Sequence, residues 1–545
     1  MLLLRKPGSF GLECRVGMAF EPKPTRRTQL YRDPRGLFVH DLILEACHRF
    51  GEKTAIIDHS TTPQRSLSYA EYGSLVERLA AQLSARFKPG EMIAIFLFNS
   101  WEFCVSYHAA TMAGCIPTLL NPSFREREVA YQLETSGAVA LITDAAHVKE
   151  VSLRRIGSVR QIYTARGEAA GAEDFGTLLQ PTTVRPARPA SDASTTIAGL
   201  PFSSGTTGFP KGVMLSHSNL VTNVFQLLAP GEEATYSKDD IALNCLPLYH
   251  IYGLNVVLNP LLVVGGTLVL IPRFEEAKFL QLLREERATF LPLVPPIINT
   301  LCHAADRGTF PHDHRVRYAK SGAAPLAADL SWKFTRQTGI RLRQGYGMTE
   351  ASPVTHLGYI EQDLYRPDSI GDAVAQTECR LHMSHESFHG ELVMRGPQFM
   401  MGYWNAPEAT SVVLRDGWYW SGDMATVDTD GFYRIVDRVK EMIKYKGFAI
   451  APAEVESVLL EHPMVRDCGI VGRQDLVAGE VPCAFVVLRD GNSGSNKIAD
   501  ELCGFVGERL TRYKQPREVR FVPLIPRNPS GKILRQKLRD ALREM

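Results

Sequence analysis

From Thr54 onward, short runs of apolar and β-branched residues alternate with stretches whose apolar residues recur at helical spacing. Ser68 and Glu71 form a capping-box pattern, which predicts a helix that begins there and continues through Ala80. The alternation continues with a strand at 92–98, a helix at 101–113, a strand at 115–120, a helix at 125–135 and a strand at 139–143. Repeated strand–helix–strand units predict an α/β fold with layered, largely parallel sheets flanked by helices.

Two changes of pattern divide the chain. At 166–196 the sequence turns to Ala, Gly, Pro, Thr and charged residues, which predicts a linker that is clearest at 184–190. The alternation then resumes to about Arg395, and 417–438 is typical of short strands joined by turns. The last part predicts strands at 442–450, 466–471, 481–488 and 518–524, with helices at 452–460 and 497–510. This order describes a small α+β unit, so we expect a large domain at 1–439 and a small domain at 440–545.

One segment, 241–272, contains no Asp, Glu, Lys or Arg and is long enough to cross a membrane. Asparagines, prolines, His250 and a Gly-Gly pair interrupt it, however, and these groups are unfavourable in lipid. The pattern favours a buried strand, loop, helix and strand over a membrane span.

Composition narrows the function classes. The chain has 545 residues, enough for two or more domains, and 61 basic against 59 acidic side chains give a net charge of +2. This balance argues against nucleic acid as a partner. Ten cysteines without a Cys-x-x-Cys pair argue against a zinc ribbon or a disulfide framework. The apolar stretch at the first residues is too short for a signal peptide, so we expect a cytoplasmic protein, with Met18 as an alternative start of the folded protein.

The residues that indicate a chemical function most clearly lie in the run Ser203-Ser-Gly-Thr-Thr-Gly-Phe-Pro-Lys-Gly212. Glycines let backbone N–H groups turn toward an anion, while the hydroxyls and Lys211 add donors and a charge, so the run predicts a phosphate-binding loop. A flexible surface linker is the alternative. A P-loop is excluded, because Pro210 stands where that motif requires glycine before the lysine.

This run resembles the signature of the adenylate-forming superfamily, which includes acyl-CoA synthetases, adenylation domains and beetle luciferases. The resemblance extends over nearly the whole chain after Pro34 and is strongest for the 4-coumarate:CoA ligase and fatty-acyl-CoA ligase branch. It implies an ATP-dependent acid-CoA ligase that uses ATP, Mg²⁺ and coenzyme A. The residues of the first signature that it assigns to ATP phosphates are Ser203, Ser204, Gly205, Thr206, Thr207, Gly208 and Lys211.

The second signature is Gln344-Gly-Tyr-Gly-Met-Thr-Glu350. By resemblance, Thr349 bonds the α-phosphate and Glu350 holds Mg²⁺, and a carboxylate oxygen is a suitable ligand for that ion. The alternative is a Gly-rich turn before a helix. The remaining ATP-binding residues that the resemblance assigns are Gly322, Ala323, Ala324, Gln344, Gly345, Tyr346, Gly347, Asp423 and Arg438, with Asp423 on the ribose.

The C-terminal run Asn528-Pro-Ser-Gly-Lys-Ile-Leu-Arg535 resembles the third signature, whose Lys532 bridges the acid carboxylate and the α-phosphate. The resemblance also makes Lys440 a hinge about which the small domain rotates, and it assigns Lys444, Lys446 and Gly447 to the CoA step. Ala449 departs from the plant aryl-CoA ligases, which carry a glutamine used in thioester formation at this position. The role of that glutamine in thioester formation therefore has no counterpart at Ala449.

The acid pocket is the least defined part of the site. The resemblance assigns it to His250, Ile251, Tyr252, Val256, Lys320, Pro353 and Val354. Val256 is bulkier than the small residue typical of the plant enzymes and Thr355 replaces a usual leucine, so aryl and aliphatic acids both remain open. Transfer to a carrier-protein thiol and a non-catalytic nucleotide-binding protein are alternative functions. We expect a monomer or a homodimer.

Overall fold

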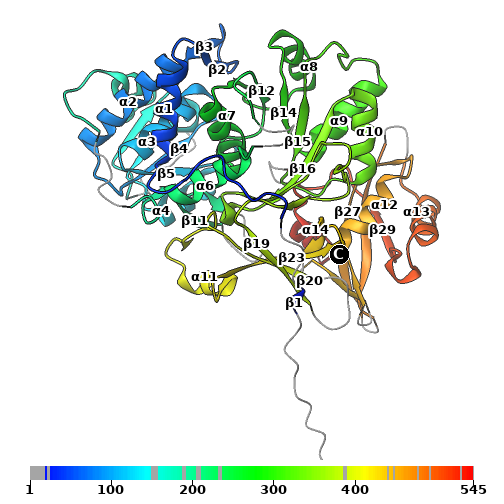
Figure 1. The fold of residues 1–545 in the computed structure, drawn as a ribbon. Helices are drawn as coiled ribbons and strands as arrows, with labels where there is room; N and C mark the ends of the chain where they lie inside the picture. The colour runs from blue at the N-terminus through cyan, green and yellow to red at the C-terminus, as the bar shows by residue number, and fades with distance from the viewer. Residues whose placement is uncertain are drawn as a thin grey trace, which may run out of the picture.

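The computed structural model describes residues 19–20, 25–148, 157–186, 192–203, 210–230, 236–383, 390–438, 441–445, 448–475, 478–489, 493–527 and 531–543. Within these ranges the chain forms a mixed α/β fold with a large N-terminal part and a small C-terminal part. In Figure 1 the C-terminal elements, coloured orange to red, gather on one side of the molecule.

The largest sheet of the described chain has nine strands, and its centre is parallel as predicted. Its order is β18 (Asp372–Ala373), β17 (Val354–Leu357), β16 (Arg341–Gly347), β15 (Tyr318–Ser321), β14 (Phe290–Leu293), β12 (Ile241–Asn244), β13 (Thr267–Leu270), β2 (Thr54–Asp58) and β3 (Arg65–Ser68). Helices α1 (Val39–Phe50), α7 (Asn259–Val264), α8 (Glu276–Glu285), α9 (Pro295–Asp306) and α10 (Ala328–Thr338) belong to the same part of the fold. β16 continues past the parallel strands and turns into β17, which carries the second signature to the sheet edge.

A second sheet is wholly parallel and contains the strands predicted near the N-terminus. It has the order β5 (Ile116–Leu119), β4 (Met92–Phe96), β6 (Ala140–Thr143), β7 (Gln161–Thr164) and β8 (Glu173–Asp174). Its helices are α2 (Tyr69–Arg86), α3 (Trp101–Met112) and α4 (Glu126–Ser136), and the short α5 (Ala145–Val148) follows β6. The capping box is present, since the Glu71 backbone N–H donates to Ser68 Oγ at 3.2 Å and the Ser68 N–H to Glu71 Oε2 at 2.8 Å.

The expected linker at 166–196 is wrong in part. Its first half contains β8 and a 3₁₀ helix, η2 (Phe175–Leu179), whose buried Phe175 and Leu178 pack into the core. Because polar residues surround Phe175 and Leu178 in the sequence, the composition of this segment does not reveal that these two residues are buried. Residues 187–191, in the part of the predicted linker that is richest in proline, lie outside the described residues.

The uncharged segment 241–272 folds as predicted into strand, loop, helix and strand. β12 leads through a loop into a π-helix, η3 (Gly253–Leu258), which continues as α7 and ends before β13. Within the described chain, no helix is both long enough and apolar enough to span a membrane. The asparagines that interrupt segment 241–272 are buried, with Asn255 at 0% and Asn259 at 1% exposure. They therefore lie in the interior of the protein.

Antiparallel sheets complete the large part. One contains β1 (Ala19–Phe20), β19 (Glu378–Met383), β20 (Gly390–Arg395), β23 (Trp418–Val427), β22 (Leu414–Arg415) and β24 (Tyr433–Arg438). The predicted strands at 417–438 are the hairpin of β23 and β24. A smaller sheet contains β9 (Ile197–Gly199), β10 (Phe202–Ser203), β11 (Lys211–Ser216) and β21 (Gly402–Tyr403), with α6 (His217–Leu227) and α11 (Pro407–Val413) beside it.

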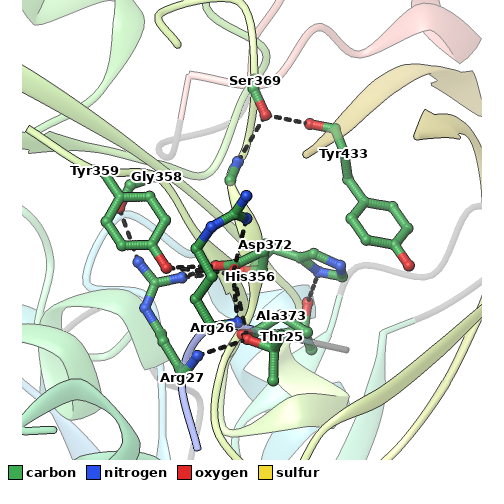
Figure 2. Close-up of polar contacts among 12 residues, drawn as sticks. Thr25, Arg26, Arg27, His356, Gly358, Tyr359, Ser369, Asp372, Ala373 and Tyr433 are labelled. Atoms are coloured by element: carbon green, nitrogen blue, oxygen red, sulfur yellow. Dashed lines mark hydrogen bonds and ion pairs between the residues drawn. The ribbon is translucent and has the colours of Figure 1, made fainter. Parts of the chain in front are cut away.

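Residues near the N-terminus are tied to this part by a buried ion pair. The Arg27 guanidinium pairs with the Asp372 carboxylate, and both side chains are at least 95% buried. Figure 2 shows the surrounding contacts, in which the Tyr359 hydroxyl donates to Asp372 Oδ1 at 3.0 Å and Arg27 donates to the Gly358 carbonyl at 3.1 Å. The Arg26 backbone N–H adds a bond of 3.0 Å to Asp372 Oδ2. The buried charges of Arg27 and Asp372 therefore neutralise each other, and both side chains also have hydrogen-bond partners.

The C-terminal part contains β25 (Ile443–Tyr445), β26 (Phe448–Ile450), α12 (Pro452–Leu460), β27 (Val465–Asp475), β28 (Gly479–Leu488), α13 (Asn496–Arg509), β29 (Glu518–Phe521) and α14 (Arg535–Arg543). The single strand predicted at 442–450 is wrong, because β25 and β26 pair antiparallel as a hairpin. The final helix α14 was not predicted, because a highly charged sequence obscures its few apolar contacts, such as Leu538. The domain boundary at Val439 and Lys440 falls outside the described residues and stays a prediction.

Candidate active site

A cleft of about 1850 Å³ brings together residues of the three predicted signatures. It is lined by strands of the large sheet, by the small sheet of β10, β11 and β21, by the hairpin of β23 and β24, and by the C-terminal part. The predicted site residues on its wall are Ser203, Lys211, His250, Ile251, Tyr252, Val256, Lys320, Gly322, Ala323, Gly345, Tyr346, Gly347, Thr349, Glu350, Pro353, Val354, Asp423, Arg438 and Lys532. The structure thus gathers segments that are more than 300 residues apart in the sequence.

Glu350 lies on the wall of this cleft, in the 3₁₀ turn η4 (Thr349–Ala351), and we call the part of the wall around it the polar end. Its side chain is buried, and Oε1 accepts hydrogen bonds from Ser203 Oγ at 3.0 Å and from the Tyr403 hydroxyl at 2.8 Å. Lys211 is near, with Nζ 5.6 Å from the centre of the Tyr403 ring. β11 pairs with both β10 and β21, so the small sheet places all these side chains around the carboxylate.

The surroundings of Glu350 fit a magnesium ion that is bound mainly by phosphate and water. The part of the chain that the structure describes contains no group of three or more His, Cys, Asp or Glu side chains able to enclose a metal. Mg²⁺ keeps several waters and commonly uses one or two protein carboxylates together with substrate phosphates. The hydrogen bonds from Ser203 and Tyr403 both go to Oε1 of this carboxylate, so the carboxylate keeps the capacity to hold an ion.

Asp423 and Arg438 face each other across the β23–β24 hairpin. Arg438 Nε lies 2.7 Å from Asp423 Oδ1, and the Tyr346 hydroxyl donates to Asp423 Oδ2 at 2.5 Å. Asp423 is 4% exposed, so its charge depends on these partners. Each carboxylate oxygen can accept a second hydrogen bond, which leaves capacity for the hydroxyls of a sugar.

Lys532 enters the cleft from the C-terminal part. Burial lowers the pKa of its ammonium group, and the nearby Arg438 guanidinium lowers it further, while Glu441 and Asp423 act in the opposite direction. A lysine in these surroundings is a cation that has lost much of its water. Such a charge interacts more strongly with an anion than a solvated lysine does.

Another part of the cleft wall, which we call the apolar end, carries mainly apolar side chains. Ile251, Tyr252 and Val256 come from the segment that contains the π-helix, and Pro353 and Val354 come from the start of β17. A side chain at Gly322 would come within 3.2 Å of the Tyr252 ring, so the absence of one keeps this wall open.

Two polar side chains lie in this apolar end. Desolvation lowers the pKa of His250 to about 4, so the ring is neutral near pH 7, and its Nδ1 accepts the Tyr252 N–H at 3.2 Å. Lys320 is buried, with Nζ 3.9 Å from the centre of the Tyr236 ring. The ammonium group is thus held against an aromatic face, an arrangement that stabilises a buried cation.

Comparison with known proteins identifies the family of the chain. Residues 43–404 match the family profile described as AMP-binding enzyme, and residues 454–532 match the profile of the AMP-binding enzyme C-terminal domain. The chain belongs to the AMP-binding enzyme family.

Curated relatives of this AMP-binding enzyme include acid-CoA ligases. It is 37% identical to 4-coumarate–CoA ligase 5 of Oryza sativa subsp. japonica, over 93% of this chain and 95% of the relative. It is also 37% identical to 4-coumarate–CoA ligase 3 of Arabidopsis thaliana, over 93% and 92%. A benzoate CoA ligase structure from Burkholderia xenovorans LB400 is 27% identical, with a TM-score of 0.81 over 92% of this chain and 100% of the other. The protein is an enzyme, an AMP-forming acid–thiol ligase.

Some predicted residues lie away from the cleft wall of this AMP-binding enzyme. Ala324 is not part of the wall, and the Gln344 side chain turns toward the Leu326 and Pro367 carbonyls. Lys444 is exposed on β25, where its backbone N–H donates to Glu480. Ser204, Gly205, Thr206, Thr207, Gly208, Lys440, Lys446 and Gly447 lie outside the described residues.

The sequence analysis missed residues that help to build the site. Tyr403 bonds Glu350 but belongs to no signature, and only the pairing of β21 with β11 brings it there. Tyr249 and Leu357 line the apolar end. Tyr249 adjoins the predicted His250, so extending that segment by one residue would have included it.

Proposed function

We propose that this enzyme joins an aryl acid of the 4-coumarate type to coenzyme A in two steps. The acid carboxylate first attacks the α-phosphorus of ATP, which gives an acyl-adenylate and releases pyrophosphate. The CoA thiol then attacks the acyl carbon, loses its proton and displaces AMP. The observation that carries the proposal is the shared cleft, in which an apolar pocket adjoins Glu350, Asp423 and Lys532.

The polar end holds the nucleotide in this proposal. Asp423, oriented by Arg438 and Tyr346, accepts the ribose hydroxyls. Ser203 and Lys211 lie on either side of residues 204–209 in the sequence, and these residues would bind the outer phosphates. Thr349 donates to the α-phosphate, and Glu350 would hold Mg²⁺, which supplies charge neutralisation at the phosphates when it is bound.

Lys532 acts in the first step. Two anions, the carboxylate and the α-phosphate, must approach each other, and negative charge builds up on the oxygens between them. A partly desolvated ammonium group at this position stabilises that charge without reorganising solvent. Lys532 also orients the carboxylate for attack, which lowers the entropic part of the barrier.

The second step is assigned to a different position of the C-terminal part. Rotation about Lys440, from a proposed boundary at Val439 and Lys440, would withdraw Lys532 and bring the strand of Lys444, with Lys446 and Gly447, toward the cleft. Lys444 is exposed in the arrangement described here, as a residue that acts only after rotation would be.

The aryl substrate rests on two supports. The curated relatives named above are 4-coumarate–CoA ligases, and the aromatic side chains of Tyr249 and Tyr252 line the apolar end, which suits a flat acid better than a long flexible chain. A medium-chain fatty acid is the second candidate, because Val256 adds apolar surface where the plant enzymes carry a small residue.

A screen of AMP release tests this proposal. Purified enzyme is given ATP, Mg²⁺ and aryl, medium-chain or long-chain acids, with and without CoA. We expect CoA-dependent AMP release to be fastest with hydroxylated aryl acids. Adenylate formation without any response to CoA would favour transfer to a carrier protein, and absence of pyrophosphate exchange with every acid would contradict enzymatic function.

A further inference from the structure

Tyr403 contacts two charged side chains at the polar end of the cleft, although it belongs to none of the three signatures. Its hydroxyl donates to Glu350 Oε1 at 2.8 Å, and Lys211 Nζ lies over its ring, 5.6 Å from the ring centre. The face of an aromatic ring attracts a cation at this distance. One tyrosine therefore engages both a carboxylate and an ammonium group.

The backbone of Tyr403 is held in place by the small sheet. Tyr403 pairs with Val213 of β11, and its N–H donates to Thr410 Oγ1 at 2.9 Å. The next residue, Trp404, donates its N–H to the Gly212 carbonyl at 2.8 Å. Tyr403 is also buried, so its ring keeps a defined position relative to the strand that begins with Lys211.

The segment 400–403 also holds the main chain of Glu350. The Met400 N–H donates to the Glu350 carbonyl at 2.8 Å. Gly402, between Met400 and Tyr403, has a φ of +147°, which a residue with a side chain rarely adopts. A Cβ at Gly402 would also come within 3.1 Å of Thr410 Cγ2. The glycine therefore allows one short segment to contact Glu350 at both its backbone and its carboxylate.

The Tyr403 hydroxyl remains a hydrogen-bond donor in these surroundings. Burial raises the pKa of Tyr403 above its usual value, and the negative charge of Glu350 raises it further. A tyrosine that keeps its proton has one O–H to donate, and Tyr403 donates it to Glu350 Oε1. The same oxygen accepts from Ser203 Oγ at 3.0 Å. Two donors from different strands therefore restrict the orientation of the carboxylate.

Lys211 and Glu350 carry opposite charges and contact the same ring. Glu350 is only 7% exposed, so water screens its attraction for a nearby ammonium group weakly. If the two groups paired directly, each would be less available to a phosphate or a metal ion. Hydroxyl groups bind the carboxylate instead, and an aromatic face receives the ammonium group.

We propose that Tyr403 is a positioning residue for the metal site: its hydroxyl orients the Glu350 carboxylate that holds Mg²⁺, and its ring keeps Lys211 from pairing with that carboxylate. This inference rests on the proposed function, because the metal ion is the one that accompanies ATP. Partners that orient a metal ligand affect the affinity of the site for the metal. The loss of Tyr403 should therefore change how strongly ATP binding depends on Mg²⁺.

Calorimetric titration of the enzyme with ATP tests this proposal. The affinity for ATP is measured in Mg²⁺ and in EDTA, without acid or CoA, so that no adenylate forms. Tyr403→Phe removes the hydroxyl and keeps the ring, whereas Tyr403→Leu removes both. The matched control is Tyr433→Phe, at a buried tyrosine of β24 whose hydroxyl has no hydrogen-bond partner among the described residues. The melting temperature and the KM for 4-coumarate are measured for each variant.

We expect Mg²⁺ to increase the ATP affinity of the wild-type enzyme, and Tyr403→Phe to reduce this increase at least about threefold, because Glu350 loses a donor. The ATP affinity of Tyr403→Phe in EDTA should stay within about twofold of wild type, since the ring still receives Lys211. Tyr403→Leu should reduce the Mg²⁺ effect as well and lower the affinity in EDTA at least about threefold. Tyr433→Phe should change neither affinity, and the KM for 4-coumarate should stay within about twofold in every variant.

Three results would overturn the proposal. The first is a Mg²⁺ effect of wild-type size in folded Tyr403→Phe. The second is an equal loss in Tyr433→Phe, which would show that the variants act only through packing. The third is a wild-type ATP affinity that does not depend on Mg²⁺. A wild-type enzyme that binds no ATP in either buffer would instead contradict the proposed function, so the two failures are distinguishable.

Discussion

The two ends of the cleft are built in different ways. At the nucleotide end, the residues that line the cleft also hold one another: Glu350 accepts from Ser203 and Tyr403, and Asp423 is bound by Arg438 and Tyr346. At the acid end, hydrocarbon side chains such as Ile251, Val256 and Val354 have no polar atoms with which to bond. The backbone of Ser352 and Val354 is held instead by Asn255 and Asn223, which do not line the cleft. The nucleotide end is thus specified by its own residues, and the acid end by a second layer.

Substitution of Lys532 should produce the largest effect at the nucleotide end. We expect Lys532→Ala to slow adenylate formation about 100-fold to 1000-fold, because the charge that stabilises the transition state is lost. Thioester formation from supplied acyl-adenylate should be nearly unchanged. Pyrophosphate exchange and CoA-dependent thioester formation measure the two steps. Lys537→Ala, at another lysine on the same cleft wall, is the control. Equal losses in both steps would contradict the separation of roles.

Asp423→Asn should weaken ATP use without affecting the acid. The amide still fills the space but loses the charge that pairs with Arg438 and accepts ribose hydroxyls. We expect kcat/KM for ATP to fall about 10-fold to 100-fold, as for the loss of charge-assisted hydrogen bonds. Steady-state kinetics with each substrate varied in turn measure this. Asp428→Asn, in the turn of the same hairpin, should have little effect. A comparable rise in the acid KM for Asp423→Asn would show that the two ends are not independent.

Val256→Phe is the complementary change at the acid end. The larger ring narrows the pocket, so we expect kcat/KM for the preferred acid to fall about tenfold while that for a smaller acid is spared. The ATP KM should remain unchanged. Val257→Leu enlarges the neighbouring residue, which is not part of the cleft wall, and serves as the control. Uniform loss with every acid would argue for general disruption of the π-helix.

The smallest expected effect is a shift in pH dependence. Burial and Arg438 lower the pKa of Lys532 from the usual 10.5, and the protonated form is the one that stabilises the adenylation step. As the pH rises through this lowered pKa, the ammonium group loses its proton and adenylation falls. A profile of pyrophosphate exchange from about pH 7 to 10 should show this alkaline decline. In Lys532→Arg, whose guanidinium stays protonated, the decline should be absent from any residual activity.

The difference between the two ends also explains what the sequence could predict. The parallel sheets follow from alternating patterns, and the nucleotide residues lie in short motifs, so both could be located without a structure. Asn255 and Asn259, in contrast, were visible only as polar interruptions of an apolar run. Their partners lie far away, since Asn255 bonds Ser352 across 97 positions and Asn259 bonds His108 across 151. No local pattern encodes such contacts.

The C-terminal part shows the same limit on a smaller scale. The hairpin of β25 and β26 was predicted as one strand, because the alternation of its residues does not reveal where the chain reverses. The helix α14 depends on contacts such as that of Leu538 with the core of β27 and β28, which its charged sequence hides. The pattern of apolar residues shows which side chains of an element can be buried. The segment that the element packs against determines its length and where it ends.

The ion pair of Arg27 and Asp372 has a consequence for the order in which the protein is made. The two residues are separated by 345 positions, so a ribosome that adds about 5 to 20 residues per second needs roughly 20 to 70 s between them. During that time Asp372 is not yet available to Arg27, although all residues of the parallel sheet of β4 to β8 are synthesised well before it. The contact can form only after most of the large part has been synthesised, and it would then secure the N-terminal segment as one of the last events in folding.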